Sequence, residues 1–491
     1  MTRNEVIGYA RGTRGRHGGS LRVVAAGLVF VLLVLCGRGY ARERDMYEAW
    51  EETLLFGIDS EVGSVLDQIA QSGETGLDDL IVERFLTSRS ERLRVSIVEH
   101  FHVRESTRLH EAVHALLLDD EAVLGDELTR VSTTYLSQVV EDHSPQLLAR
   151  YEQIAERGSL LASTIAIDAI GRNGSEAAVG LLLDLFTRLR GTDQRAAVLR
   201  ALGRTGSDDA LPLLSLIAAD EFEESALRHY AAESLGRIGS PESVTLLTSL
   251  LGSSDSLLRA YATLALGFYD ENETGALLEQ ALRDSFWRVR VAALQALGEQ
   301  QRGAAVRAIE YVARRDPERT VRQAAIRSLG SIGNADSTTR LGDLARNERT
   351  GEAERILAVE QLARSGVFES REVLEELMAA EWDREGSRLL DAIGRLLSDH
   401  PDARLDDLYG RLMVHPNYII RIYGMRAVGS AGLESRTDQL KEIARESPAG
   451  IVRRTALASL SAMGVDYDPE IETEDERVDG TGEASGGQGG E

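Results

Sequence analysis

The chain has 491 residues and a formal net charge of −25 at pH 7, with 80 acidic residues against 55 lysines and arginines. A surface this acidic is poorly suited to nucleic acid or anionic lipid, so we expect no nucleic-acid partner. Aromatic residues make up only 5%, and the chain has only 8 prolines. Because the chain is too long for one ordinary core, this composition predicts an all-α fold built from repeats.

The first 41 residues have the features of an export signal. Several arginines precede an apolar run of 14 residues at 23–36, and Gly39-Tyr40-Ala41 fits a small-x-small cleavage site. A spanning helix needs about 20 apolar residues, so the run favours a signal peptide over a retained signal anchor. Lipidation of Cys36, the only cysteine, is a further alternative. We predict an exported protein, in the periplasm or on the outer face of the cytoplasmic membrane, which touches the membrane only if residues 1–41 stay attached.

A helical pattern from Leu227 to Gly239 is the unit from which the rest of the chain is built. Leu227, Tyr230 and Ala231 begin an apolar series that continues with Ser234 and Leu235, the spacing of one buried helical stripe. Gly236 stands where a neighbouring helix could approach closely. Gly239, three residues later, is placed as a left-handed helix cap.

The position of Gly236, called here the reference position, recurs thirteen times at spacings of 31 to 35 residues. Its occupants are Ala70, His102, Ser137, Gly171, Gly203, Gly236, Gly267, Gly298, Gly330, Ala363, Gly394, Gly429 and Ser461. Eight of these are followed three residues later, at what we call the stop position, by a glycine: 73, 174, 206, 239, 333, 366, 432 and 464. A second apolar segment, such as 210–220, lies between stops. The pattern predicts an α-solenoid of about twelve helix-turn-helix repeats over residues 42–465.

The form Arg-x-x-Ala-Ala-x-x-Leu-Gly-x-x-Gly resembles HEAT repeats, in particular the phycobilisome-lyase type, and the resemblance covers residues 50–464. It is best in the helices that end near Gly203, Gly236, Gly298 and Gly330. The first three repeats match poorly, with His102 and Ser137 in place of glycine, and the repeat of Gly394 has no stop glycine. We expect irregular packing or a binding site at those repeats.

Nine repeats carry an arginine eight residues before the reference position: Arg94, Arg195, Arg228, Arg259, Arg290, Arg322, Arg355, Arg421 and Arg453. One interpretation is a basic row for phosphates. The resemblance to HEAT repeats implies instead that each arginine pairs with an aspartate in the turn before it, and the available residues are Asp193, Asp220, Asp255, Asp284 and Asp316. We favour this structural arginine ladder, formed by Arg195, Arg228, Arg259, Arg290 and Arg322.

His110, Glu111 and His114 match the zincin motif His-Glu-x-x-His, in which two histidines one turn apart bind zinc and the glutamate activates water. Third ligands could come from Glu127, Glu141 or Asp142. The same segment also fits the first helix of an ordinary repeat, with His110 at the border of its buried stripe and His114 further outside it. A zinc-dependent hydrolase is therefore the alternative hypothesis, and the leading one has no catalytic residues and no metal.

Two enzyme families share similar repeats. Deoxyhypusine hydroxylases, which these repeats resemble, bind iron through His-Glu pairs after the ladder arginine, whereas this chain has Arg228-His229-Tyr230 there. Bilin lyases act on cytoplasmic proteins, and this chain has an export signal. We therefore predict no cofactor.

Residues 466–491 hold ten acids and a single arginine, so we predict a disordered acidic tail. The leading hypothesis is a non-enzymatic scaffold or assembly factor of the cell envelope. It would bind an unidentified partner protein through the second helices, around Gln295, Arg327 and Arg426.

Overall fold

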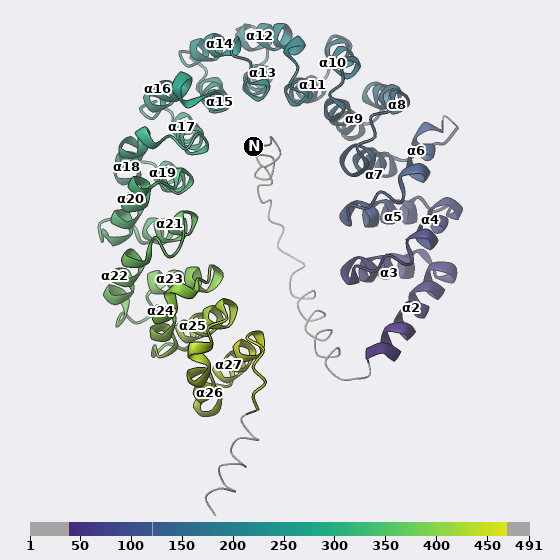
Figure 1. Cartoon of the computed structure of the whole chain (residues 1–491). Coiled ribbons are helices and arrows are strands. Elements are labelled where there is room, and N and C mark those ends of the chain that lie inside the picture. The colour runs from purple at the N-terminus through teal and green to yellow at the C-terminus, as the bar shows by residue number, and fades with distance from the viewer. Residues whose placement is uncertain (1–38, 120, 469–491) are drawn as a thin grey trace, which may run out of the picture. The chain divides into compact units, whose positions relative to one another are not determined.

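The computed structural model describes residues 39–119 and 121–468 (Figure 1). All regular elements in these two stretches are helices, with no strand among them. None of those helices is both long enough and apolar enough to cross a membrane. The apolar run at 23–36 and the acidic segment from 469 onward lie outside the described residues, so the leader and the tail remain predictions. Residues 39–41, at the expected cleavage site, open the first described helix.

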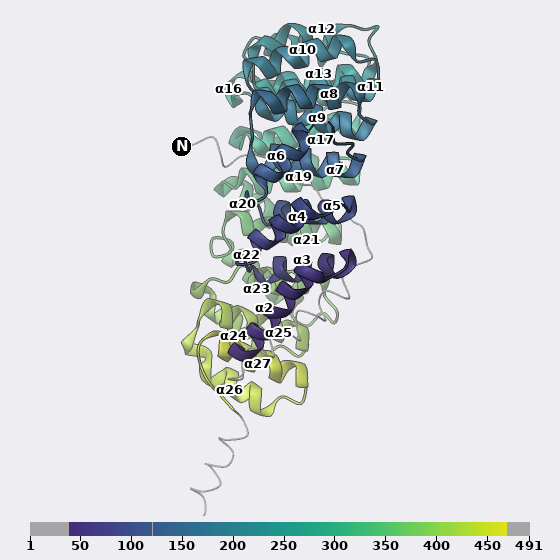
Figure 2. The same cartoon turned by 90° about the vertical axis from the view of Figure 1, so that its right-hand side faces the viewer.

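The chain divides into two compact units, with the boundary after Asn173. The first unit contains α2 (Gly39–Phe56), α3 (Asp59–Ser72), α4 (Asp78–Thr87), α5 (Glu91–Val103), α6 (His110–Leu118), α7 (Asp126–Tyr135), the π-helical η2 (Leu136–Val140), α8 (Pro145–Arg157) and α9 (Leu160–Asn173). These helices stack in pairs (Figure 2). The second helices α3, α5, α7 and α9 form one layer, and the first helices α2, α4, α6 and α8 form the other.

The second unit repeats this pairing with shorter turns. Its first helices are α10 (Glu176–Arg188), α12 (Leu211–Ala219), α14 (Ser243–Leu250), α16 (Glu271–Ala281), α18 (Val306–Arg315), α20 (Ala335–Arg346), α22 (Arg371–Glu381), α24 (Asp406–Met413) and α26 (Thr437–Glu446). Its second helices are α11 (Thr192–Thr205), α13 (Ser225–Ile238), α15 (Ser256–Leu266), α17 (Trp287–Glu299), α19 (Arg319–Ile332), α21 (Glu352–Leu362), α23 (Arg388–Asp399), α25 (Tyr418–Ala431) and α27 (Gly450–Ala462). Within this unit the second helices lie on the inner side of the stack (Figure 1). The predicted α-solenoid is thus confirmed.

The second helices pack closely because small residues occupy the reference position. A Cβ on Gly236 would lie 2.6 Å from the Cα and Cβ of Ala265 on the next second helix. Backbones this close leave no room for a side chain. Hydroxyl groups add hydrogen bonds between the same helices: Ser234 Oγ donates to the Leu199 carbonyl at 2.8 Å, and Ser328 Oγ donates to the Leu294 carbonyl at 2.6 Å.

All eight predicted stop glycines have positive φ, as the sequence pattern indicated. Two residues that are not glycine adopt the same conformation at the same stop position: Glu105, with φ of 52°, and Gln301, with φ of 51°. The stop is therefore a property of the repeat rather than of the glycine. The sequence could not reveal these two, because the left-handed conformation is rare for a glutamate or a glutamine.

The expected irregular packing is found at two places, one in each unit. In the first unit, Ser137 lies within the π-helical η2, which is followed by Glu141 with φ of 55°. In the repeat of Gly394, α23 ends at His400 with φ of −127° instead of a left-handed cap. Both departures fall where the sequence departs from the repeat pattern.

Candidate protein-binding surface

Ion pairs of the arginine ladder join successive repeats of the second unit. Arg259 donates from Nε and Nη2 to the two carboxylate oxygens of Asp284, both at 2.9 Å. Arg290 holds Asp316 in the same bidentate way, at 2.8 and 2.9 Å. The guanidinium of Arg259 also lowers the pKa of Asp284 by hydrogen bonding to its charged form. Both pairs are shielded from solvent, which makes them strong links between neighbouring repeats.

The same geometry recurs with glutamate as the acid. Nη2 donates to carboxylate in the pairs Arg195–Glu223 at 3.0 Å, Arg322–Glu354 at 3.0 Å and Arg355–Glu381 at 3.1 Å. Four of the five named ladder arginines thus meet an acid, and Arg228 is the exception. Its Nε donates to the Ala218 carbonyl at 3.4 Å.

The prediction that each ladder arginine pairs with an aspartate in the turn before it is wrong. Asp284 pairs with Arg259 of the preceding repeat, and Arg290 reaches forward to Asp316. The turn before Arg290 contributes backbone instead, since Nη1 donates to the Asp284 carbonyl at 3.0 Å. The fork of the guanidinium explains the difference: one edge binds the turn of its own repeat, and the other edge faces the next repeat.

The aspartates at the other predicted positions have local roles. Asp255 accepts from the backbone N–H of Leu257 and of Leu258, capping α15, and its Oδ2 lies 2.8 Å from His229 Nε2. Asp220 accepts from the Phe222 N–H at 2.9 Å. Asp220 and Asp255 thus accept from backbone N–H groups close to the start of a second helix.

A groove of about 560 Å³ opens between the second helices α3, α5 and α7 of the first unit. Two reference-position residues, Ala70 and His102, line it, together with Arg92, Glu99 and Arg130. The groove therefore lies where the sequence lacks glycine at the reference position. His102 Nδ1 is buried without a hydrogen-bond partner among the described residues. The groove lies at the poorly matching repeats, where the sequence predicts irregular packing or a binding site, and binding there stays a prediction.

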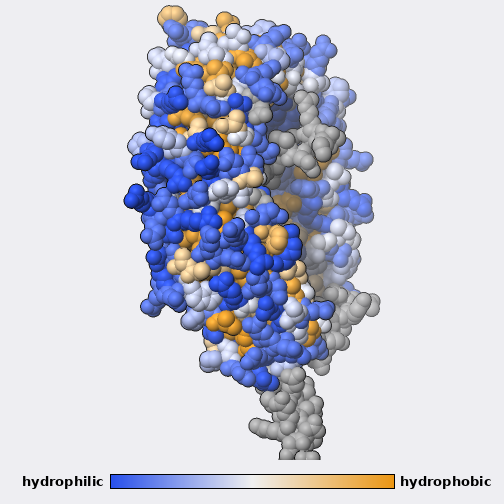
Figure 3. Space-filling model, turned by 60° about the vertical axis from the view of Figure 1, so that its left-hand side comes forward, coloured by the Kyte–Doolittle hydropathy of each residue, from blue (hydrophilic) through white to orange (hydrophobic). Residues whose placement is uncertain are grey.

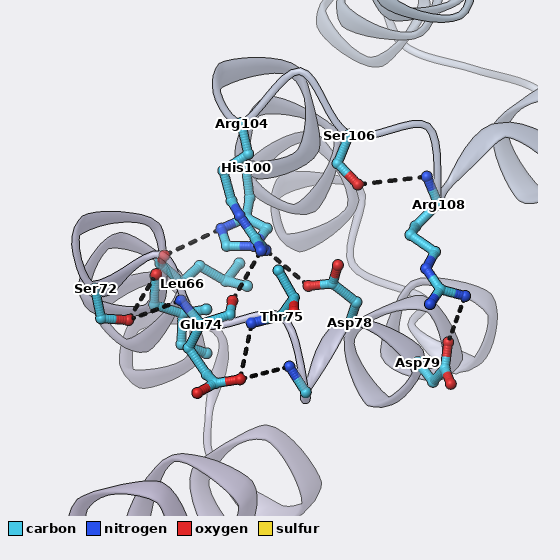
Figure 4. Close-up of polar contacts among 12 residues, drawn as sticks. Leu66, Ser72, Glu74, Thr75, Asp78, Asp79, His100, Arg104, Ser106 and Arg108 are labelled. Atoms are coloured by element: carbon cyan, nitrogen blue, oxygen red, sulfur yellow. Dashed lines mark hydrogen bonds and ion pairs between the residues drawn. The ribbon is translucent and has the colours of Figure 1, made fainter. Parts of the chain in front are cut away.

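A buried polar network beside this groove joins α3, α4 and α5 (Figure 4). Arg104 Nη1 lies 2.7 Å from Asp78 Oδ1 and 2.8 Å from His100 Nε2, while Nη2 donates to the Glu74 carbonyl. His100 Nδ1 lies 3.0 Å from the Leu66 carbonyl, so it must donate there, and Nε2 then accepts from Arg104. Burial, followed by the charge of Arg104, lowers the pKa of His100 and keeps the imidazole neutral.

The zincin-like residues lie at the start of α6. Nε2 of His110 is 2.7 Å, and Nε2 of His114 3.6 Å, from the same oxygen, Asp142 Oδ2. Of the three possible third ligands, Asp142 alone meets both histidines, and Glu127 pairs with Arg130 at 2.6 Å. Burial would raise the pKa of Asp142, but hydrogen bonds from His110 and Ser144 outweigh it and lower that pKa. No group of three or more His, Cys, Asp or Glu in residues 39–119 and 121–468 is arranged to hold a metal ion.

An aromatic row crosses the second helices α13 and α15 on the inner side of the second unit. It consists of Tyr230 on α13 and Tyr261 on α15, both partly exposed. The two rings meet edge to face with centroids 6.3 Å apart, and Arg200 Cζ lies 4.8 Å from the Tyr230 ring centre. Such partly exposed aromatic rings beside an arginine are typical of protein-binding hot spots.

The sequence pattern placed Tyr230 in the buried stripe of α13, whereas the structure leaves it partly exposed. His229 is the buried neighbour instead, stacked on Tyr261 with centroids 5.1 Å apart. The error arises because helical periodicity gives a direction around the helix but not the position of the next helix. A partial signal was available, since aromatic residues are rare in this chain and two of them stand six residues before the reference position in adjacent repeats.

The three positions expected on the partner-binding side, Gln295, Arg327 and Arg426, are exposed on α17, α19 and α25. Gln295 donates to Glu299 on its own helix at 2.9 Å. On the face toward the first helices of the second unit, hydrophilic residues cover most of the surface and apolar residues form smaller patches between them (Figure 3).

Paired helices, interlocked second helices and a repeated inter-repeat ion pair define this protein as a HEAT-repeat α-solenoid. More particularly, the chain belongs to the family described as Spirochaete HEAT repeat protein, whose model matches residues 54–459. No curated protein matches the chain.

Several solved structures are similar to the chain at low sequence identity. Kap121p is 12% identical with a TM-score of 0.41, over 90% of this chain and 55% of the Kap121p chain. The complex of CpcE and CpcF of phycocyanin lyase from Nostoc sp. PCC7120 is 21% identical with a TM-score of 0.32, over 49% of this chain and 96% of that chain. Human deoxyhypusine hydroxylase is 19% identical with a TM-score of 0.24, over 52% and 95%.

Proposed function

We propose that this protein is a non-enzymatic scaffold of the cell envelope, which binds a partner protein through the second helices of its second unit. The aromatic row is the observation that carries the proposal. Tyrosine and arginine side chains supply most of the binding energy in many interfaces, because they offer a large apolar area together with polar groups. Solenoid repeats present such side chains on one extended surface.

The rigidity of that surface supports the same function. The ring of Tyr261 stacks on the imidazole of His229, and His229 Nε2 in turn lies 2.8 Å from Asp255 Oδ2. Arg259, on the same helix as Tyr261, is fixed by Asp284. A side chain that is ordered before binding loses less conformational entropy when a partner arrives, so the row is preorganised for association.

The place of action in the envelope is inferred from the sequence of residues 1–41, with their basic residues, apolar run and small-x-small site. Mass spectrometry of the mature N-terminus tests it. A first residue at position 42 supports export with cleavage, and a lipid-modified Cys36 would support attachment to the membrane. An intact N-terminus on protein recovered from the cytoplasm would contradict the proposal.

Crosslinking in cells, followed by affinity purification of tagged protein from the envelope fraction, tests partner binding. We expect a reproducible partner whose recovery falls at least tenfold in the Tyr230→Ala, Tyr261→Ala double variant, because hot-spot truncations cost about 2 kcal/mol each. Tyr311→Ala on α18 is the matched control: this tyrosine is 69% exposed and lies on a first helix. Failure to recover a partner, or equal losses in both variants, would contradict the proposal.

A further inference from the structure

A second surface lies at the far end of the second unit, where α23, α25 and α27 present a groove of about 450 Å³. We call it the arginine groove. Arg426 and Arg454 line it with the hydroxyl-bearing Ser398, Ser430 and Thr455, together with Asp399, Ser459, Ala458 and Ala462. The side chains at its base are small, so the groove can accept a polypeptide segment without displacing a bulky residue.

The two arginines of the groove are unlike the ladder arginines. Arg290 is buried and bound to Asp316, whereas Arg426 and Arg454 are exposed. Within residues 39–119 and 121–468, the side chains of Arg426 and Arg454 form no hydrogen bond and no ion pair. Against the single carboxylate of Asp399, the groove therefore has excess positive charge in a chain whose net charge is −25. Such a surface attracts an anionic segment.

The chain itself supplies a segment of the required charge. Residues 469–491 contain eight acids and one arginine. They start seven residues after Ala462, which ends α27 and lines the groove. A segment tethered this closely has an effective concentration on the order of millimolar, so weak ionic contacts are enough to hold it. A separate acidic protein would have no tether and would be repelled by the overall charge of the chain.

We propose that residues 469–491 bind in the arginine groove of the same chain, with their carboxylates against Arg426 and Arg454 and against the hydroxyl groups of Ser398, Ser430 and Thr455. The contact is ionic, so it weakens with salt. It does not depend on whether the aromatic row binds a partner.

Fluorescence anisotropy of a dye on residue 485 tests this. The full chain with Cys36→Ser and Ser485→Cys has one thiol, because Cys36 is the only natural cysteine. We expect slow dye rotation at low salt and fast rotation at 0.5 M NaCl. In the Arg426→Gln, Arg454→Gln double variant, the ratio of bound to free segment should fall about fivefold, the effect of two surface ion pairs.

The Arg307→Gln, Arg349→Gln variant removes the same charge from exposed sites outside the groove and should leave the anisotropy unchanged. If the groove variant unfolds by circular dichroism, neutralising Glu472, Glu474 and Glu476 to Gln tests the same contact from the other side and should also free the dye. Fast dye rotation at low salt in the labelled chain with an intact groove would overturn the proposal, and so would equal effects of the groove and control variants. Anisotropy that falls on dilution would also overturn it, because the occupant would then be a second copy.

Discussion

The two units carry the same repeat but differ at its reference position. In the second unit Gly236 lets a neighbouring second helix approach so closely that a Cβ would clash with Ala265. In the first unit Ala70 and His102 occupy that position, and a groove lies between the helices. The ladder differs in parallel: Arg94 donates only to the Phe85 carbonyl, at 3.2 Å, while Arg290 holds a carboxylate. At these two places, glycine at the reference position accompanies close contact between second helices, and a residue with a side chain accompanies a groove.

Removing one ladder arginine should give the largest effect. Arg290→Met leaves Asp316 buried without its cation, at a cost of about 3 kcal/mol. Arg94→Met in the first unit leaves no unpaired carboxylate and should cost less than about 1 kcal/mol. Urea titrations followed by circular dichroism measure both. Equal losses would show that the ladder stabilises the two units alike.

The second-largest effect should come from adding a side chain at the reference position, which should destabilise the second unit more than the first. Gly236→Val forces a branched side chain against the backbone of α15 and should destabilise the protein by about 2 kcal/mol. Ala70→Val points into the groove of the first unit, where the added methyl groups find space, and should cost less than about 0.5 kcal/mol. The same titrations decide. A large cost at Ala70 would contradict the account of the groove.

The polar network of the first unit should make its stability depend on pH. Because the pKa of His100 is lowered in the folded state, the unfolded chain binds the proton more readily. The contribution of His100 to the free energy of unfolding is fully present above about pH 6.5. Below that pH it decreases, by at most about 1.4 kcal/mol per pH unit. The groups that face His100 are Arg104, Asp78 and Asp67.

His100→Gln isolates that contribution, since Gln does not titrate. Unfolding midpoints at pH 7.5 and pH 5.5 should differ less in the variant than in the unmodified protein. His229→Gln is the control in the second unit, where the imidazole faces Asp255 instead of an arginine. The same pH difference in His100→Gln as in the unmodified protein would refute a role for His100.

The smallest effect concerns the stop position. Gln301 adopts a left-handed conformation that costs a residue with a side chain about 1 kcal/mol relative to glycine. Part of that gain is lost to the greater freedom of glycine in the unfolded chain, so Gln301→Gly should stabilise by about 0.5 kcal/mol. A thermal melt would show a small upward shift. Destabilisation would mean that the glutamine side chain contributes a contact of its own.

The sequence predicted the fold through its glycines. A glycine at the reference position allows a neighbouring helix to approach closely, and a glycine at the stop position allows the left-handed conformation that ends a helix. It did not predict that Asp316 pairs with Arg290, 26 residues before it, instead of Arg322, 6 residues after it, because that choice depends on how neighbouring repeats pack. Nor did it reveal that Tyr230 is exposed, since exposure depends on the neighbouring helix. Periodicity describes one helix, whereas sites are formed between helices.

The forward direction of the ladder gives two unlike sides to those repeats of the second unit whose arginine meets an acid of the next repeat. Arg259 offers a cation to the repeat that follows, and Asp284 offers an anion to the repeat that precedes. Arg453, in the last repeat, donates to the Ser447 carbonyl and meets no acid within the described stretches of the chain. A duplicated repeat inserted in register would therefore restore both junctions at once. Because each junction uses the same kind of ion pair, a whole repeat can be added to or removed from the array without a new type of interface.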